Sequence, residues 1–99
     1  MVTLVGLARL LGMSPQKVKR LVAQGVLPRP KVIGRIHVWD WLDLQAVGID
    51  PERAPYLRVS EAARLLGISS AKLREKLPAE VLRLGDEVRV PLGVLGQIE

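Results

Sequence analysis

A seven-residue segment occurs twice in this chain, and that repeat restricts the fold more than any other feature. Residues 8 to 14, Ala-Arg-Leu-Leu-Gly-Met-Ser, return 55 positions later as Ala-Arg-Leu-Leu-Gly-Ile-Ser, and Lys17-Val18 returns as Lys72-Leu73. A repeat at a fixed offset is typical of a chain that builds the same supersecondary unit more than once. We therefore expect two copies of one unit within the 99 residues.

The apolar residues around each repeat have helical spacing. Positions i, i+3, i+4 and i+7 are apolar before each glycine, which places them on one buried face of a helix. They are Leu4, Leu7, Ala8 and Leu11 in the first copy and Val59, Ala62, Ala63 and Leu66 in the second. Ala8 and Ala63 are small where a second helix would cross the first closely.

A glycine and a serine separate this helix from a second one in each copy. Gly12 and Gly67 stand where a left-handed residue ends a helix, and Ser14 and Ser69 stand where an N-cap starts the next. Each copy is therefore predicted to be a helix-turn-helix. The alternative, an ordinary pair of helices joined by a glycine turn, would have to produce the same small residue, glycine and serine twice.

The charge of the chain favours an anionic partner. Its net charge is +5 and its sequence pI is about 10.2, which is typical of proteins that bind nucleic acid. Residues 1–50 hold seven cationic and three acidic side chains, whereas residues 51–99 hold eight and seven. The first copy is therefore the more basic one, although a basic surface also serves solubility alone in some small proteins.

The composition excludes several kinds of site. The chain has no cysteine, so it has no disulfide, no thiolate zinc site and no cysteine nucleophile. It shows no glycine-rich phosphate loop and no catalytic constellation, so we expect no enzyme activity, metal, cofactor or small-molecule ligand. No apolar run approaches the roughly 18 residues of a spanning helix, and no signal peptide is recognisable. We therefore expect a cytoplasmic protein without a membrane partner.

The second helix of the first copy carries the first group of candidate binding residues. We expect it to run from about Pro15 to Gln24 and to end at Gly25. Its outer face would hold Gln16, Lys17, Lys19 and Arg20. Three cations within four residues are either an ordinary solvated face or, in a helix-turn-helix, the face that enters the major groove of DNA.

Residues 31–38, Lys-Val-Ile-Gly-Arg-Ile-His-Val, have the pattern of a β-hairpin. Two β-branched runs flank Gly34-Arg35, and glycine suits the first position of a type II′ turn. Because an isolated two-stranded hairpin is unstable, we expect it to pack on the helices as a wing that presents Lys31 and Arg35. His37 is predicted to be an ordinary strand residue, since no catalytic constellation surrounds it.

The first copy, residues 1–48, is predicted to end with a short helix over residues 41–47, capped by Asp40. The residues expected to close the core below this helix are Trp39, Trp41, Leu42 and Ala46. Trp39 and Trp41 are alternatively a surface for a second copy or another protein, because tryptophan is favoured at buried contacts with partners.

The second copy, residues 57–99, should follow a short and stiff linker over residues 49–56. Ser60 would cap its first helix, and Pro78 would end its second. Its hairpin, residues 81–90, has an acidic tip, so this copy is expected to contact DNA more weakly than the first. The residues expected to make these weaker contacts are Ser70, Lys72, Arg74, Arg83 and Arg89.

The order of helix-turn-helix, hairpin and short closing helix resembles the winged helix-turn-helix unit of phage and transposon excisionases and of MerR-type regulators. The likeness is carried by residues 7–14, 17–21, 25–28 and 34–35. It covers nearly all of residues 3–47 and, less well, residues 58–95. The resemblance implies a mainly α fold with small β-hairpin wings, arranged as tandem units. It also implies that Gln16, Lys17, Lys19 and Arg20 enter the major groove and that the wing places Lys31 and Arg35 on the backbone or minor groove.

Two functions are expected from these patterns. The first is a double-stranded DNA-binding protein of a bacterium or phage, either a transcription regulator or an excisionase-like architectural factor in recombination. Such a protein would act at the nucleoid, with the first copy reading the DNA and the second supporting it. The alternative is a protein-protein adaptor that binds its partner through Trp39, Trp41 or the C-terminal copy.

Overall fold

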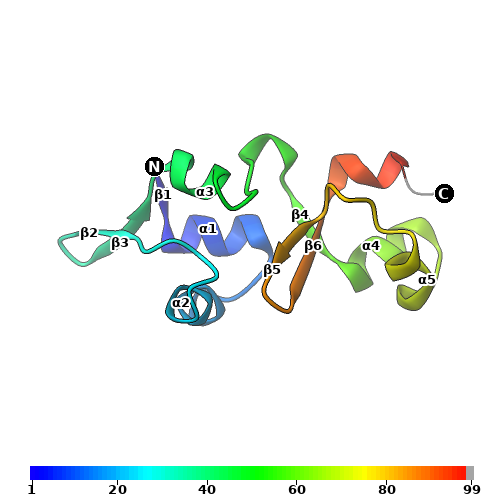
Figure 1. The fold of residues 1–99 in the computed structure, drawn as a ribbon, viewed down its shortest axis with the longest axis horizontal. Coiled ribbons are helices and arrows are strands. Elements are labelled where there is room, and N and C mark those ends of the chain that lie inside the picture. The colour runs from blue at the N-terminus through cyan, green and yellow to red at the C-terminus, as the bar shows by residue number, and fades with distance from the viewer. Residues whose placement is uncertain (98–99) are drawn as a thin grey trace.

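The chain folds as two similar units joined end to end in an elongated molecule of 46 × 22 × 18 Å, as seen in a computed structural model (Figure 1). The structure describes residues 1–97, so residues 98 and 99 of the predicted second copy lie outside the described residues. The fold is mixed α/β, because each unit contains a three-stranded antiparallel sheet in addition to its helices. The prediction of a mainly α fold missed the third strand of each sheet.

The two units contain the same elements in the same order. The first unit consists of β1 (Val2–Thr3), α1 (Leu4–Leu11), α2 (Pro15–Ala23), β2 (Lys31–Ile33), β3 (Ile36–Trp39) and α3 (Trp41–Gln45). A short 3₁₀ helix, η1 (Pro51–Arg53), leads to the second unit. The second unit consists of β4 (Tyr56–Arg58), α4 (Val59–Leu66), α5 (Ser70–Glu75), β5 (Leu82–Leu84), β6 (Glu87–Pro91) and η2 (Leu92–Gln97).

The predicted turns between the paired helices are confirmed. Gly12 and Gly67 follow α1 and α4 with left-handed φ values of 63° and 69°. The hydroxyls of Ser14 and Ser69 accept hydrogen bonds from the third N–H of α2 and α5, at 3.2 and 3.1 Å. Ser60 is not the predicted cap, because α4 already begins at Val59. These turns hold α2 across α1 and α5 across α4.

The two sheets have equivalent strand orders, β1–β3–β2 and β4–β6–β5. Hairpin 1 (β2–β3) turns at Gly34-Arg35, and hairpin 2 (β5–β6) turns at Gly85-Asp86. Both glycines have positive φ, as the first position of a type II′ turn requires. The predicted hairpins are therefore confirmed, whereas β1 and β4 are too short to give a recognisable pattern in the sequence.

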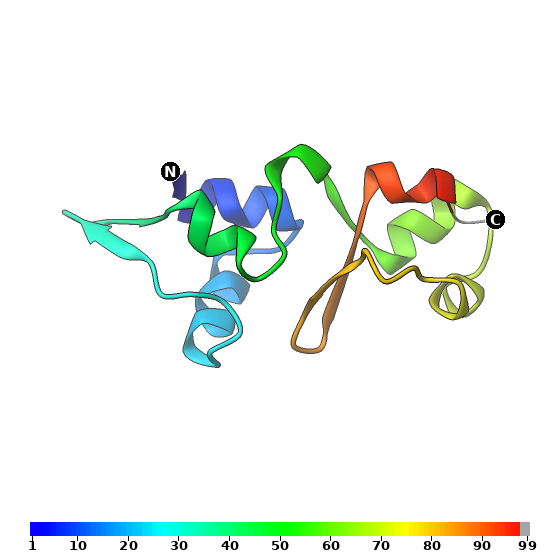
Figure 2. The same ribbon diagram turned by 45° about the horizontal axis from the view of Figure 1, so that its top comes forward.

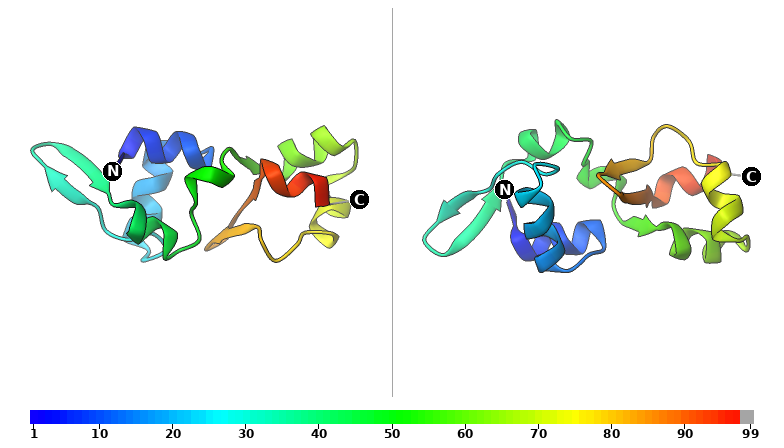
Figure 3. Two further views of the ribbon diagram at one scale, coloured as in Figure 1. Left: turned by 90° about the horizontal axis from the view of Figure 1, so that it is seen from above. Right: turned by 60° about the horizontal axis from the view of Figure 1, so that its bottom comes forward.

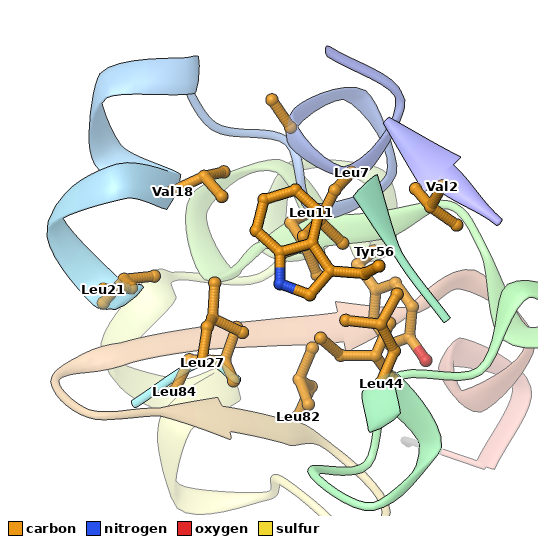
Figure 4. Close-up of a cluster of buried hydrophobic side chains, with 13 residues drawn as sticks. Val2, Leu7, Leu11, Val18, Leu21, Leu27, Leu44, Tyr56, Leu82 and Leu84 are labelled. Carbon is orange, nitrogen blue, oxygen red and sulfur yellow. The ribbon is translucent and has the colours of Figure 1, made fainter. Parts of the chain in front are cut away.

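The first hydrophobic core includes Trp39, which is 1% exposed. Figure 4 shows how side chains of both units, among them Leu7, Leu44 and Leu82, meet in this core. The indole N–H of Trp39 donates to the backbone oxygen of Pro28 at 2.7 Å, which fixes the loop after α2 onto the core. Trp39 is therefore a core residue and not the partner surface considered for it. Trp41 is half-buried against the same core. Leu42 and Ala46 were predicted to close the core, but both are exposed because α3 turns only Leu44 inward.

The predicted linker over residues 49–56 begins and ends in this same core. Ile49 is fully buried and Tyr56 is 3% exposed. The hydroxyl of Tyr56 accepts from the N–H of Asp50 and donates to the backbone oxygen of Asp50, at 2.8 and 3.1 Å. The segment is therefore a packed connection whose length and path are fixed by the first unit.

The sheet β4–β6–β5 of the second unit packs against the first unit and contributes apolar side chains to a core from each of its faces. Tyr56, Leu82 and Leu84 belong to the core of the first unit, and Leu57, Val88 and Val90 face the core of the second. Successive side chains of a strand point to opposite faces of a sheet, so one strand supplies both cores. The units consequently share a layer of structure, as the side views in Figure 3 show for hairpin 2 between the two helix pairs.

The equivalent glycines Gly12 and Gly67 offer a matched test of this shared layer. A Cβ at Gly12 would meet the backbone oxygen of Tyr56 at 3.2 Å, whereas nothing lies within 4 Å of a Cβ at Gly67. We expect Gly67→Ala to lower the free energy of unfolding by about 1 kcal/mol through left-handed strain alone. Gly12→Ala should cost at least about 1 kcal/mol more, because β4 must move away. Urea denaturation measures both, and equal losses would contradict the close approach of β4.

Candidate nucleic-acid interface

Helix α2 lies between hairpin 1 on one flank and hairpin 2 on the other (Figure 2). Hairpin 2 contacts it closely, since a Cβ on Gly85 would meet Val26, just after α2, at 3.3 Å. Hairpin 1 forms the wall of a cleft that Lys19 lines from the other side. The cations of α2 therefore lie in two different environments. Those on one flank face hairpin 1, and those on the other flank face hairpin 2.

Three of the four residues predicted on the outer face of α2 are exposed, namely Gln16, Lys19 and Arg20. None of them has an ion-pair partner among residues 1–97. Lys17 differs, because its ammonium group lies 2.6 Å from the Glu87 carboxylate of hairpin 2. Lys17 is therefore less open than the other three residues predicted on this face: it is half-buried and its charge is paired.

The cleft between α2 and hairpin 1 consists of two adjoining hollows of about 400 and 240 Å³. Lys19 and His37 line both hollows, Arg29 lines the larger, and Arg35 lines the smaller. Among residues 1–97, no aspartate or glutamate lines either hollow. Cationic groups that converge on a concave surface without carboxylates raise the local positive potential and attract anions.

Arg29 is a member of this group that sequence analysis did not identify. It lies in the loop between α2 and β2, where Pro28 and Pro30 interrupt any helical or strand periodicity. The signal that could have identified it is its place between an expected binding helix and an expected hairpin. A loop of that kind has to cross the surface that both elements form.

Lys31 lies outside this cleft. Its position in β2 pairs with Val38, whereas the cleft residue Val32 pairs with His37, so Lys31 projects from the opposite face of the sheet. Its ammonium group lies 2.7 Å from the Asp40 carboxylate, and the hydrogen bond to Asp40 raises the pKa of Lys31. Asp40 is the N-cap residue of α3, as predicted, but its side chain makes this ion pair and no cap hydrogen bond.

The weaker candidates of the second unit fall into two groups. Ser70, Lys72 and Arg74 on α5 are exposed, as is Arg83 on β5. Arg89 is 5% exposed, so its assignment as a DNA contact is wrong. Its side chain points at the first unit, where Nε donates to the backbone oxygen of Leu11 at 2.6 Å.

Glu87 connects the buried arginine to α2. One carboxylate oxygen pairs with Lys17, and the other accepts from Nη1 of Arg89 at 3.0 Å. The hydrogen bond from Lys17, with further help from Arg89, holds the pKa of Glu87 below its ordinary value. Lys17, Glu87 and Arg89, called the junction triad below, thus join α2 to hairpin 2.

A second cleft of about 490 Å³ opens beside the junction triad, between the two units. It is lined by the cations Lys17, Arg58, Arg74 and Arg89 and by the carboxylates of Asp86 and Glu87. Charges of both signs partly cancel there. This cleft is therefore a poorer anion site than the one between α2 and hairpin 1.

Comparison of the chain with protein-family models, with curated proteins and with solved structures finds no match of any of the three kinds. Within residues 1–97, no helix has the length and apolar character needed to cross a membrane. The same residues contain no group of three or more His, Asp or Glu side chains that could hold a metal ion.

The junction triad predicts a contribution of Glu87 to acid stability. Because the folded-state pKa of Glu87 is lowered, its contribution is fully present above the unfolded pKa, near 4.5, and is lost as pH falls through the folded value. We expect Glu87→Gln to lower the free energy of unfolding at pH 7 by about 1 kcal/mol or less and to have a smaller effect at acid pH. Chemical denaturation at several pH values measures this difference.

Asp86→Asn is the matched control, because Asp86 is an exposed neighbour at the tip of the same hairpin. It makes no ion pair with any residue from 1 to 97. An equal pH-dependent loss in both variants would show that the effect comes from net charge and not from the junction triad.

Proposed function

We propose that this protein binds double-stranded DNA through its first unit, in the manner of a winged helix-turn-helix. The observation that carries the proposal is the cleft between α2 and hairpin 1, where Lys19, Arg29 and Arg35 converge without a carboxylate. Arg20 adds a further exposed cation on the same helix. Exposed cations on a helix and its neighbouring hairpin suit a duplex, whose two phosphate backbones border the major groove.

The chemistry of these side chains suggests a division of roles. Gln16, at the N-terminal end of α2, can bind an adenine edge with its amide, and Arg20, one helical turn later, can bind a guanine edge. Lys19, Arg29 and Arg35 flank the helix on the hairpin side, where phosphates would lie. The three phosphate contacts would supply most of the affinity, and the two groove residues would supply selectivity.

The second unit would support the first and contact DNA only weakly. Hairpin 2 buries one face against the first unit, so it is not free to act as a wing. Its tip carries the exposed carboxylate of Asp86, which phosphates would repel. Ser70, Lys72 and Arg74 remain exposed on α5 and can add backbone contacts at the edge of the site.

A DNA-binding protein of this kind would act at the nucleoid, as a transcription regulator or as an architectural factor in recombination. The alternative function, a protein-protein adaptor, has less support because Trp39 is buried in the first core and Trp41 is packed against it. The two functions differ in salt dependence, since counterion release makes DNA binding fall steeply with salt.

A matched pair of charge reversals tests the ranking of the two units. Lys19→Glu places a carboxylate in the cleft of the first unit, and Arg74→Glu places one at the equivalent position of α5. We expect Lys19→Glu to weaken duplex binding by about 2 kcal/mol or more, and Arg74→Glu by about 1 kcal/mol at most. Fluorescence anisotropy with a labelled duplex measures both. Equal losses would mean that both units read DNA.

A second pair of variants tests hairpin 1 as a wing. Arg35 lies at its tip, and Arg83 is an exposed arginine on hairpin 2. Arg35→Ala should make the slope of log affinity against log salt shallower by about one, as expected for one lost phosphate contact. Arg83→Ala should leave the slope nearly unchanged. A parental slope for Arg35→Ala would remove hairpin 1 from the interface.

A further inference from the structure

The two sheets are equivalent, but the hairpin end of the first sheet is exposed where that of the second is packed. Directly opposite residues of an antiparallel pair share a face, so Leu82, Leu84, Glu87 and Arg89 lie on one face, called the outer face, which packs on the first unit. Matching the two hairpins at their turns makes Ile33 equivalent to Leu84 and Ile36 equivalent to Glu87. The outer face of sheet β1–β3–β2 therefore includes Ile33 and Ile36.

The outer face of the first sheet carries two exposed isoleucines at its hairpin end, whereas Val38 on the same face is buried and Lys31 is paired with Asp40. Ile33 and Ile36 are each 56% exposed, whereas the equivalent of Ile33, Leu84, is 1% exposed. Met1 continues the alternation of β1 onto this face and is also exposed. Exposing two isoleucines on a projecting hairpin to water is unfavourable, and burying them against another surface would be favourable.

The surface that receives the outer face in the first unit has an uncovered equivalent in the second. Gly12 lies against the backbone of β4, whereas Gly67 has nothing near it. Leu11 is fully buried beneath the second sheet, whereas its equivalent Leu66 is only half-buried. Next to it, Leu65 is 65% exposed. The far end of the second unit thus repeats the receiving surface, without an occupant among residues 1–97.

We propose that a second copy of this chain docks head to tail, with the outer face of its first sheet against the end of α4 in the second unit. This contact between two chains would be equivalent to the contact that joins the two units within one chain. Because such an interface joins two different surfaces, a dimer still has one free surface of each kind. Further copies can therefore add to both of its ends. Asp86, the equivalent of Arg35, stays exposed at the junction within the chain, so docking leaves Arg35 open.

The contact between chains should be weaker than the contact within the chain. Ile36 and Val38 replace Glu87 and Arg89, so the copy offers no arginine to the carbonyl of Leu66. Arg35 on one copy and Lys72 on the other also carry like charges. Salt screens this repulsion, so association should increase with salt. DNA binding, in contrast, decreases with salt. Measuring self-association and DNA binding at two salt concentrations therefore distinguishes the failure of one proposal from the failure of the other.

The test uses charge-neutral variants of the full chain in sedimentation velocity without DNA. The sheet variant is Ile33→Thr with Ile36→Thr, which keeps β-branched residues in the hairpin. The receiving variant is Leu65→Gln, and the control is Leu42→Gln, because Leu42 is 78% exposed on α3 and outside both surfaces. Circular dichroism and thermal unfolding verify that each variant folds.

We expect the parent and Leu42→Gln to associate between about 0.01 and 1 mM, more at 0.5 M than at about 0.1 M salt. Each of the other two variants should remain monomeric. An equimolar mixture of them should give a dimer that does not extend, because each supplies the surface that the other lacks.

Three results would overturn the proposal: a monomeric parent throughout this range, loss of association in Leu42→Gln, or a mixture that stays monomeric. Association of Leu65→Gln alone would also overturn it, since two outer faces would then pair with each other.

Discussion

The structure depends on one three-stranded sheet that has to satisfy two hydrophobic cores. A unit of about fifty residues buries little apolar surface and is only marginally stable alone. Sheet β4–β6–β5 solves this for both units, since Leu82 and Leu84 of β5 fill the first core, whereas Val88 and Val90 of β6 fill the second. Removing either unit would expose one apolar face of the sheet, so the two units are expected to fold as one.

The buried guanidinium of Arg89 sets the position of this sheet. Burying a charge is costly unless it is paired and hydrogen-bonded. Arg89 donates through Nε to the backbone oxygen of Leu11 and through Nη1 to the carboxylate of Glu87 and the backbone oxygen of Val88. Leu11 is the last residue of α1, where a carbonyl has no partner in the helix and a cation is favoured by the helix dipole. The directional hydrogen bond from Arg89 to Leu11 therefore fixes the position of β6 against α1, in addition to the packing of apolar side chains.

The local features of the fold could be predicted from the sequence, and the junction could not. Gly12, Ser14 and the two-residue turn at Gly34-Arg35 act through their own backbone conformation, so their types alone indicate the turns. In the sequence, Arg89 and Lys17 cannot be told from an arginine and a lysine on an open surface. Only the packing of hairpin 2 on α2 determines that they face each other across Glu87. Charge patterns in a sequence give no information about such long-range partners.

The same packing explains why two copies of one unit differ in what their surfaces can bind. Lys17 of α2 is held by Glu87, so transferring its ammonium group to a phosphate would exchange one anionic partner for another and add little net affinity. Lys19, only two residues away, projects toward hairpin 1 and keeps its full charge available, since no carboxylate lines that cleft. This difference between the two flanks of α2 therefore follows from the side on which the second unit packs against the first. Hairpin 2 covers one flank of α2 and pairs its Lys17 with Glu87, whereas the other flank faces hairpin 1, whose tip carries Arg35. The DNA-binding surface that we propose would consequently be concentrated on that open flank, whatever the net charge of the whole chain.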